Sequence, residues 1–132
     1  MPKENVELAR QAYDAYNRDG IDGIIEYLDS EVEWRNPPES ADAAVFIGHQ
    51  GVVEWQRMVD EAFKEMQFEP KRIELPDGRV LAVVSFRFRA PYSEVDVEVP
   101  IAHIMTWRDG KATAFNMYTS EADALDAAGL AE

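Results

Sequence analysis

A histidine inside an apolar, strand-like run is the side chain best suited to acid–base chemistry near neutral pH. The run is VPIAHIMTWRDGK, residues 99–111, with His103 near its middle, and the chain has only two histidines. An imidazole can give or take a proton in this range, so His103 is a candidate general base or acid. A buried imidazole is costly unless it is hydrogen-bonded, so the alternative is a core histidine whose ring nitrogens are satisfied by neighbouring groups.

The surroundings of His103 predict how it titrates. If the ring lies on an apolar wall, desolvation lowers its pKa below the usual ~6.5 and keeps the imidazole neutral at pH 7. An inward carboxylate would raise the pKa, and the sequence offers no confident candidate. The other histidine, His49, stands beside Gly48 at the start of a predicted helix, where we expect a solvated loop residue.

Composition and charge exclude several kinds of site and partner. The chain has no cysteine, which removes thiol nucleophiles and thiolate metal ligands, and two histidines without a carboxylate cluster predict neither metal nor cofactor. A net charge of −13 repels phosphate backbones and anionic lipid, so we expect no nucleic-acid or membrane partner. No run approaches the ~20 apolar residues of a membrane span, and the N-terminus lacks an apolar signal region, so a cytoplasmic protein is expected.

The elements that must position His103 divide into a helical first half and a strand-rich second half. Apolar residues recur at spacings of three and four before the chain changes to alternation. This pattern predicts a helix from about residue 6 to 18, a short helix over 21–28, a strand within 31–36 stopped by Pro37-Pro38, a loop over 39–48, and a helix from His49 with its apolar stripe reaching Met66.

The second half predicts an antiparallel meander. Strands are expected over 67–75, 79–90, 94–107 and 111–118, separated by the turn sequences PDG, PYS and RDG. Pro100 lies within the third of them, which predicts either an edge position or a bulge that bends the sheet. Ser120 caps a short closing helix. The order of elements is that of an α+β domain spanning residues 1–132.

Strand alternation predicts which side chains face inward. In 94–107 the odd positions are apolar apart from His103, and Met105 shares their face, whereas the even positions begin with charged residues. The same alternation turns Phe86 and Phe88 inward and Arg87 and Arg89 outward. On the last strand, Phe115 and Met117 share the inner face. A bulge at Pro100 would reverse the assignment beyond it.

Three segments of the chain resemble a known family. ELARQAYDAYNRDGIDGIIEYLDSEVEW, AHIMTWRDGKATAFNMYTS and ALDAAGL are similar to the SnoaL-like branch of the nuclear transport factor 2-like superfamily. The resemblance covers roughly residues 3–130. It implies a cone of curved antiparallel sheet packed on three helices, with a pocket at the wide end. The same fold hosts isomerases, cyclases, dehydratases, epoxide hydrolases and non-catalytic binders, so the fold does not choose the function.

Ketosteroid isomerases, which share this fold, allow a comparison position by position. The resemblance places Tyr13 at their helix-1 tyrosine donor, Asn36 at their aspartate base and His103 at their second donor. An amide cannot accept a proton at neutral pH, so the isomerase mechanism does not transfer intact. Epoxide hydrolases of this fold need an Asp-Arg-Asp set that RFR at 87–89 does not supply. Dehydratase-type members pair a histidine with an aspartate, for which Asp14 is the nearest candidate.

These residues together predict an apolar pocket with a few placed polar groups. The polar groups are Tyr13, Asn36 and His103, and the expected lining is Trp34, Trp55, Phe86, Phe88, Met105, Phe115 and Met117. One hypothesis is proton transfer on a small hydrophobic carbonyl compound by an isomerase- or lyase-type enzyme without metal, with His103 as base and Tyr13 and Asn36 holding the oxyanion. The alternatives are a binding module for a small apolar ligand and a structural or dimerisation domain.

The resemblance also implies a homodimer. Proteins of this fold often pair through the outer face of the sheet, which here would carry Arg87, Arg89 and Tyr118.

Overall fold

Six strands form one sheet in the order β2-β1-β6-β5-β4-β3. The structure is a computed structural model and describes residues 2–38, 44–74 and 79–129. Its elements are α1 (Pro2–Asp19), α2 (Ile21–Ile24), the 3-10 helix η1 (Ile25–Tyr27), β1 (Leu28–Arg35), β2 (Val45–Ile47), α3 (Gly48–Ala62), β3 (Lys64–Glu74), β4 (Val80–Arg89), β5 (Asp96–Arg108), β6 (Lys111–Tyr118) and α4 (Glu121–Ala127). The predicted PDG turn at 76–78 and residues 39–43 of the predicted loop lie outside the described residues.

The predicted meander is confirmed, since β3, β4, β5 and β6 pair antiparallel in chain order. The first strand adds to it differently, because β1 pairs with β6 in parallel, with Trp34 opposite Phe115. The expectation of a loop over 39–48 is wrong at its end, where β2 pairs antiparallel with β1. A three-residue edge strand is too short to show an alternating pattern, which explains why the sequence did not predict it.

The helix boundaries differ from the predicted ones at three places. Helix α1 begins at Pro2, before the predicted start near residue 6. The chain turns from α1 into α2 at Gly20, whose φ of 65° favours glycine, and the predicted helix over 21–28 divides into α2 and η1 before Leu28 begins β1. Helix α3 ends at Ala62 rather than near Met66, because the backbone becomes extended at Phe63. The apolar residues of that stripe beyond Ala62 therefore lie on the approach to β3 and within it.

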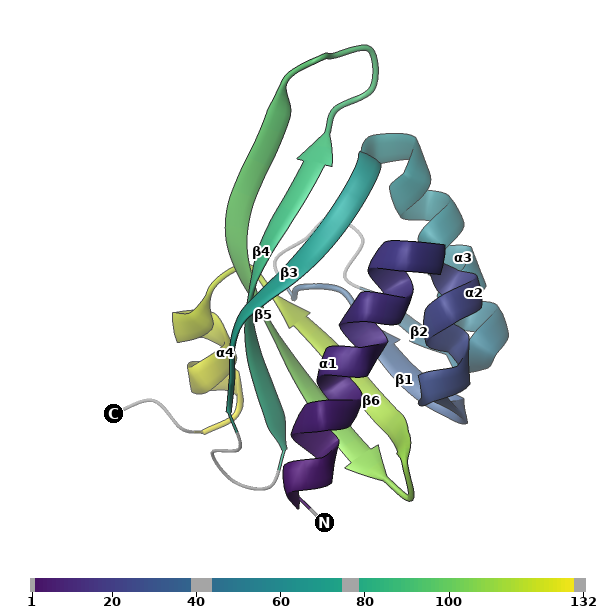
Figure 1. Ribbon diagram of the computed structural model, residues 1–132, viewed down its shortest axis with the longest axis vertical. Helices are drawn as coiled ribbons and strands as arrows, with labels where there is room; N and C mark the ends of the chain where they lie inside the picture. Colours follow the sequence, from purple (N-terminus) through teal and green to yellow (C-terminus); the bar gives the residue numbers. More distant parts are fainter. Residues whose placement is uncertain (1, 39–43, 75–78, 130–132) are drawn as a thin grey trace.

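Helices cover both faces of the sheet. Figure 1 shows α1, α2 and α3 on one side of the sheet and α4 on the other. The first three helices enclose the main core, as expected. Ser120 caps α4 as predicted, its hydroxyl accepting a hydrogen bond from the backbone N–H of Asp123 at 3.1 Å. No helix in the described ranges is long and apolar enough to cross a membrane.

Helix α4 changes the expected exposure of β5. Ala124 of α4 packs in a second buried cluster with Leu81, Ala102 and Ile104. The even positions in this half of β5 are therefore buried, although the odd positions that include His103 face the main core as predicted. Alternation assigned the face correctly but could not show that a distant helix would cover the opposite one.

Pro100 occupies an edge position and makes no bulge. The β4–β5 pairing of described residues runs from Val80–Met105 to Arg89–Asp96 in one register, with Pro100 opposite Ser85. Pairing of β5 with β6 extends only to Ala102. Among the described strands, β5 therefore pairs with β4 alone at Pro100. The side-chain faces assigned on either side of Pro100 therefore agree.

Candidate functional site

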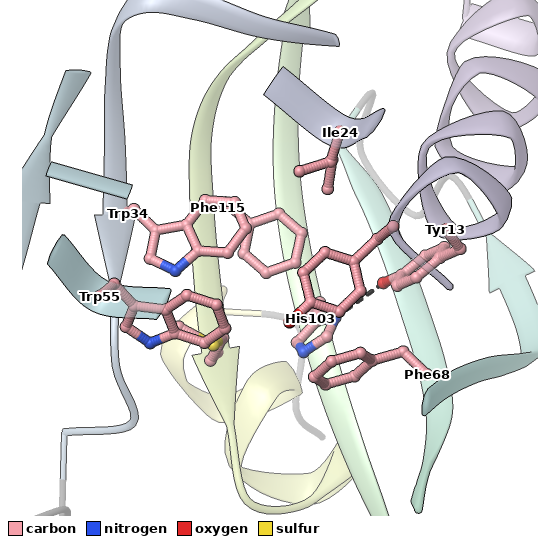
Figure 2. Close-up of a pocket in the computed structure, with 9 residues that line it drawn as sticks. Tyr13, Ile24, Trp34, Trp55, Phe68, His103 and Phe115 are labelled. Atoms are coloured by element: carbon pink, nitrogen blue, oxygen red, sulfur yellow. Dashed lines mark hydrogen bonds between the residues drawn. The ribbon is translucent and has the colours of Figure 1, made fainter. Parts of the chain in front are cut away.

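The main core encloses a small chamber with a volume of about 20 Å³, which we call the inner chamber. It lies between α1, α3 and the middle of the sheet, and Figure 2 shows the residues around it. Nine side chains line it: seven are aromatic, including His103, and the other two are aliphatic or thioether side chains. They are Tyr13, Tyr16, Ile24, Trp34, Trp55, Phe68, His103, Phe115 and Met117.

A hydrogen bond joins His103 to the first helix. The hydroxyl oxygen of Tyr13 lies 2.7 Å from Nδ1 of His103, and the dashed line in Figure 2 marks this contact. Tyr13 reaches it from the buried stripe of α1, while His103 lies in the centre of β5 opposite Ala82 and Met117. The two side chains are only 4% and 2% exposed, so the bond is shielded from water.

The other ring nitrogen of His103 is buried without a protein partner. Within the part of the chain that the structure describes, Nε2 of His103 has no hydrogen-bond partner, and the same holds for Nε1 of Trp34. The imidazole contacts Phe115 and Phe68, with ring centroids 4.6 Å and 5.9 Å apart. An unpaired donor or acceptor in such apolar surroundings is costly, which makes the inner chamber a candidate site.

Burial controls the titration of this pair. Desolvation lowers the pKa of His103 to about 3. This confirms the direction predicted from the sequence, and the ring is neutral at pH 7. Burial also raises the pKa of Tyr13 well above its ordinary value, so its hydroxyl keeps its proton.

A larger cavity of about 500 Å³, hereafter the outer cavity, adjoins the inner chamber. Trp55, Phe68 and Met117 belong to the walls of both spaces. The outer cavity lies between the C-terminal half of α3 and the part of the β4–β5 hairpin that extends beyond β6. Its lining is Asn36, Pro37, Trp55, Met58, Val59, Ala62, Phe63, Met66, Phe68, Phe86, Phe88, Val99, Ile101, Met117, Tyr118 and Thr119.

The three polar residues predicted to converge are divided between these two spaces. Tyr13 and His103 meet at the inner chamber, whereas Asn36 lies on the wall of the outer cavity. Its Oδ1 accepts a hydrogen bond of 2.7 Å from Nε1 of Trp55. Asn36 directly follows β1, so the end of the strand fixes its position. Its amide oxygen is already the acceptor of the hydrogen bond from the Trp55 indole.

Most residues predicted to line a pocket do line one of the two spaces. Trp34 and Phe115 face the inner chamber, Phe86 and Phe88 face the outer cavity, and Trp55 and Met117 contribute to both. Met105 differs: it is 2% exposed in the main core and, among the described lining residues, belongs to neither space. Along β5 it lies two residues beyond His103 in the direction away from Val99 and Ile101, which line the outer cavity.

Several lining residues were not predicted as site residues. Tyr16, Ile24 and Phe68 line the inner chamber, and Met58, Phe63 and Ile101 line the outer cavity. The apolar stripe of α3 could have identified the helix side of the outer cavity, because it includes Trp55 and continues to Val59 and Ala62. Helical spacing alone could not show that this stripe borders a hollow.

The remaining polar candidates lie away from both spaces. Asp14 is exposed on α1, so it does not form the histidine–aspartate pair of dehydratase-type proteins. His49 belongs to α3 rather than a solvated loop, and its Nε2 lies 2.9 Å from the carbonyl oxygen of Leu28. No group of three or more metal-ligating side chains occurs among residues 2–38, 44–74 and 79–129.

Sequence comparison matches residues 9–115 to a family described as the SnoaL-like domain. No curated protein sequence gives a significant match.

Solved structures share the fold at low sequence identity. An NTF2-like protein of unknown function from Burkholderia pseudomallei is similar with a TM-score of 0.77 and 21% identity, over 92% of this chain and 95% of that chain. TerC co-crystallised with polyporic acid is similar with a TM-score of 0.79 and 22% identity, over 96% and 97%. A protein with a ketosteroid isomerase-like fold from Catenulispora acidiphila, in complex with trimethylamine, has a TM-score of 0.74 and 14% identity, over 94% and 93%. At these identities the likeness establishes the NTF2-like α+β fold.

Proposed function

Because the chain belongs to the SnoaL-like domain family, we propose that it binds a small, uncharged and largely apolar molecule in the outer cavity. The observation that carries this proposal is a cavity of about 500 Å³ whose lining is mainly aromatic and aliphatic. Cavities of roughly 300–1,000 Å³ with this character are typical of small-molecule sites. A purely structural domain would have no need of such a space, so the cavity favours a ligand-binding role.

The charge distribution supports an uncharged ligand. No Asp, Glu, Lys or Arg belongs to the described lining of either space. A bound ion would therefore lose its hydration without a charged partner in the wall, which is costly. The net charge of −13 further disfavours anions. Polyporic acid and trimethylamine, present in two of the similar structures, are an acid and a base; their complexes support small-molecule binding on this fold and do not bear on the charge of the ligand.

Filling the outer cavity tests this proposal. Val59 lines the cavity from α3, so Val59→Trp should occupy the space and weaken binding of a neutral fluorescent probe, N-phenyl-1-naphthylamine, by about ten-fold or more. Val45→Trp is the matched control, because Val45 lies 40% exposed on β2 and outside the cavity lining. Circular dichroism and thermal melting establish that both variants fold. Equal probe affinity in both folded variants would contradict the proposed site.

A second candidate is proton-transfer catalysis on a hydrophobic carbonyl compound, favoured by the hydrogen-bonded Tyr13–His103 pair beside an apolar cavity. In this scheme His103 is the base and Tyr13 lies beside it to stabilise the oxyanion. Asn36, expected to share that role, lies on the wall of the outer cavity and would contribute only to a ligand that reaches both spaces. Burial leaves His103 neutral but weakly basic, so we place ligand binding first. Assays of His103→Ala and His103→Gln against enones and polyketide-like substrates test the scheme. Unchanged turnover in both variants, where the parent is active, would remove His103 from the mechanism.

We also propose the homodimer that the family resemblance implies. Of the residues expected on its face, Tyr118 instead lines the outer cavity and packs against the cluster under α4. The part of the face around Arg87 is exposed and charged, with Arg87 lying 3.8 Å from Glu69 and 3.9 Å from Glu98 across three strands. Such exposed pairs contribute little to the fold, which leaves these groups available to a partner. Light scattering at micromolar concentration should give twice the chain mass, and a monomer would remove this proposal without affecting the fold.

A further inference from the structure

We infer that Trp55 and Phe68, each held by an asparagine, close the inner end of the outer cavity and set the greatest length of ligand that it accepts. This inference rests on the proposed ligand binding and deepens it. It makes Trp55 and Phe68 specificity-determining residues and assigns positioning roles to Asn36 and Asn17. The family resemblance placed Asn36 at a catalytic base, whereas its amide oxygen is the acceptor for the Trp55 indole.

Three side chains lie where the two spaces meet. Trp55, Phe68 and Met117 are the residues common to the described linings of the inner chamber and the outer cavity. They come from α3, β3 and β6, and in the sheet β3 and β6 are separated by β4 and β5. Side chains from such different elements belong to both linings because they converge between the spaces. A ligand in the outer cavity therefore meets them at its inner end.

A hydrogen bond and an aromatic contact hold Trp55. Its indole Nε1–H donates to Oδ1 of Asn36 at 2.7 Å, and its ring meets Trp34 edge-on with the centroids 5.1 Å apart. Trp55 is buried, so an indole that swung away from Asn36 would leave its N–H without a partner in apolar surroundings. That loss is costly, which keeps the ring in place.

The amide of Asn17 holds Phe68 from the last turn of α1. Nδ2 of Asn17 donates to the carbonyl oxygen of Phe68 at 2.7 Å, and the backbone N–H of Phe68 donates to Oδ1 of Asn17 at 2.9 Å. Because β3 is the last strand in the sheet order, this amide takes the place of a neighbouring strand. The ring of Phe68 stacks on Phe86 at 4.7 Å and meets Tyr16 edge-on at 5.3 Å. Both the backbone and the ring of Phe68 are therefore fixed.

A fixed wall at one end of a cavity produces a limit on ligand length. Each methylene that enters an apolar cavity raises the affinity about four-fold, until the chain reaches a wall that does not yield. Val99, which also lines the outer cavity, is 36% exposed, so the cavity reaches the surface and further methylenes remain in water. The limit depends on the wall, and a loss of global stability alone does not move it.

A series of uncharged 1-alkanols, from 1-hexanol to 1-dodecanol, tests the inference by displacement of N-phenyl-1-naphthylamine. The parent should gain affinity with each carbon up to a limiting length and little beyond it. Trp55→Phe gives a smaller ring without the N–H, and Asn17→Ala removes both bonds to Phe68. Each should move the limit to chains longer by about one carbon or more. Trp107→Phe is the matched control and should keep the parent limit, because Trp107 is buried and outside the described linings of both spaces.

Hydrogen exchange measures the hold on Phe68 without any ligand. Its backbone N–H should exchange about ten-fold faster in Asn17→Ala than in the parent, and equal exchange rates would overturn the role of Asn17.

The binding results separate this inference from the proposed function. Alcohol binding with the same limit in the parent, Trp55→Phe and Asn17→Ala would overturn the inference and leave the proposed function standing, and either variant is sufficient if the other does not fold. An equal shift in Trp107→Phe would also overturn it, because general loosening would then explain the change. Failure of the alcohols and of N-phenyl-1-naphthylamine to bind the parent would overturn the proposed function, and the inference with it.

Discussion

Lowering the pH from 7 to 4.5 should destabilise this protein through His103. Burial places the folded-state pKa of His103 at about 3, below the ~6.5 of a histidine in the unfolded chain. Between these values the unfolded chain binds a proton that the folded chain does not. The unfolding free energy contributed by His103 is therefore fully present above pH 6.5 and falls as the pH decreases toward 3.

The size of the effect follows from the distance between the two pKa values. Each pH unit below 6.5 costs ~1.4 kcal/mol, so at pH 4.5 the loss from this one group is about 3 kcal/mol. His103 is 2% exposed, so little solvent screening reduces this value. For a domain of this size such a loss is a large fraction of the total stability.

Urea unfolding at pH 7, 6, 5 and 4.5 measures this effect. The parent is compared with His103→Phe and His103→Leu, which retain every carboxylate and remove only the imidazole. Both variants should lose less stability than the parent on acidification, by about 3 kcal/mol at pH 4.5, whatever their stability at pH 7. Parallel pH curves for all three proteins would mean that His103 titrates as in water, and the buried site would be refuted.

Three substitutions probe other parts of the structure by urea unfolding. Tyr13→Phe leaves Nδ1 of His103 unpaired and should lower the free energy of unfolding by about 1–3 kcal/mol. Tyr16→Phe should lower it less, because the Tyr16 hydroxyl bonds to a partly exposed partner. Equal losses in the two variants would argue against the buried bond. Ser120→Ala removes the α4 cap and should cost about 1 kcal/mol, and an unchanged midpoint would contradict the cap. Gly51→Ala places a Cβ 2.8 Å from the β2 backbone and should cost about 1–3 kcal/mol; a neutral effect would show that β2 can move away from α3.

Local sequence patterns predicted much of the fold. The turn sequences PYS and RDG separated strands whose structural bounds lie within two residues of the predicted ones, and β6 matches its predicted range. Period-2 alternation placed His103, Phe115 and Met117 on the inner face because successive side chains of a strand must point to opposite sides. The β2 strand and the covering of Ala102 by α4 were missed, since each depends on a segment that is distant along the chain.

Only part of the candidate site could be predicted from the sequence. Residue type and strand face were sufficient to select His103 and to predict that its pKa is lowered, because both depend on the apolar neighbours along one strand. The tertiary structure alone decided that Tyr13, ninety residues away, occupies Nδ1, and that Trp55 holds Asn36 in a different space. It also decided the volumes of the inner chamber and the outer cavity. Hydrogen-bond partners and cavity sizes depend on how whole elements pack, and spacing along the chain does not specify that packing.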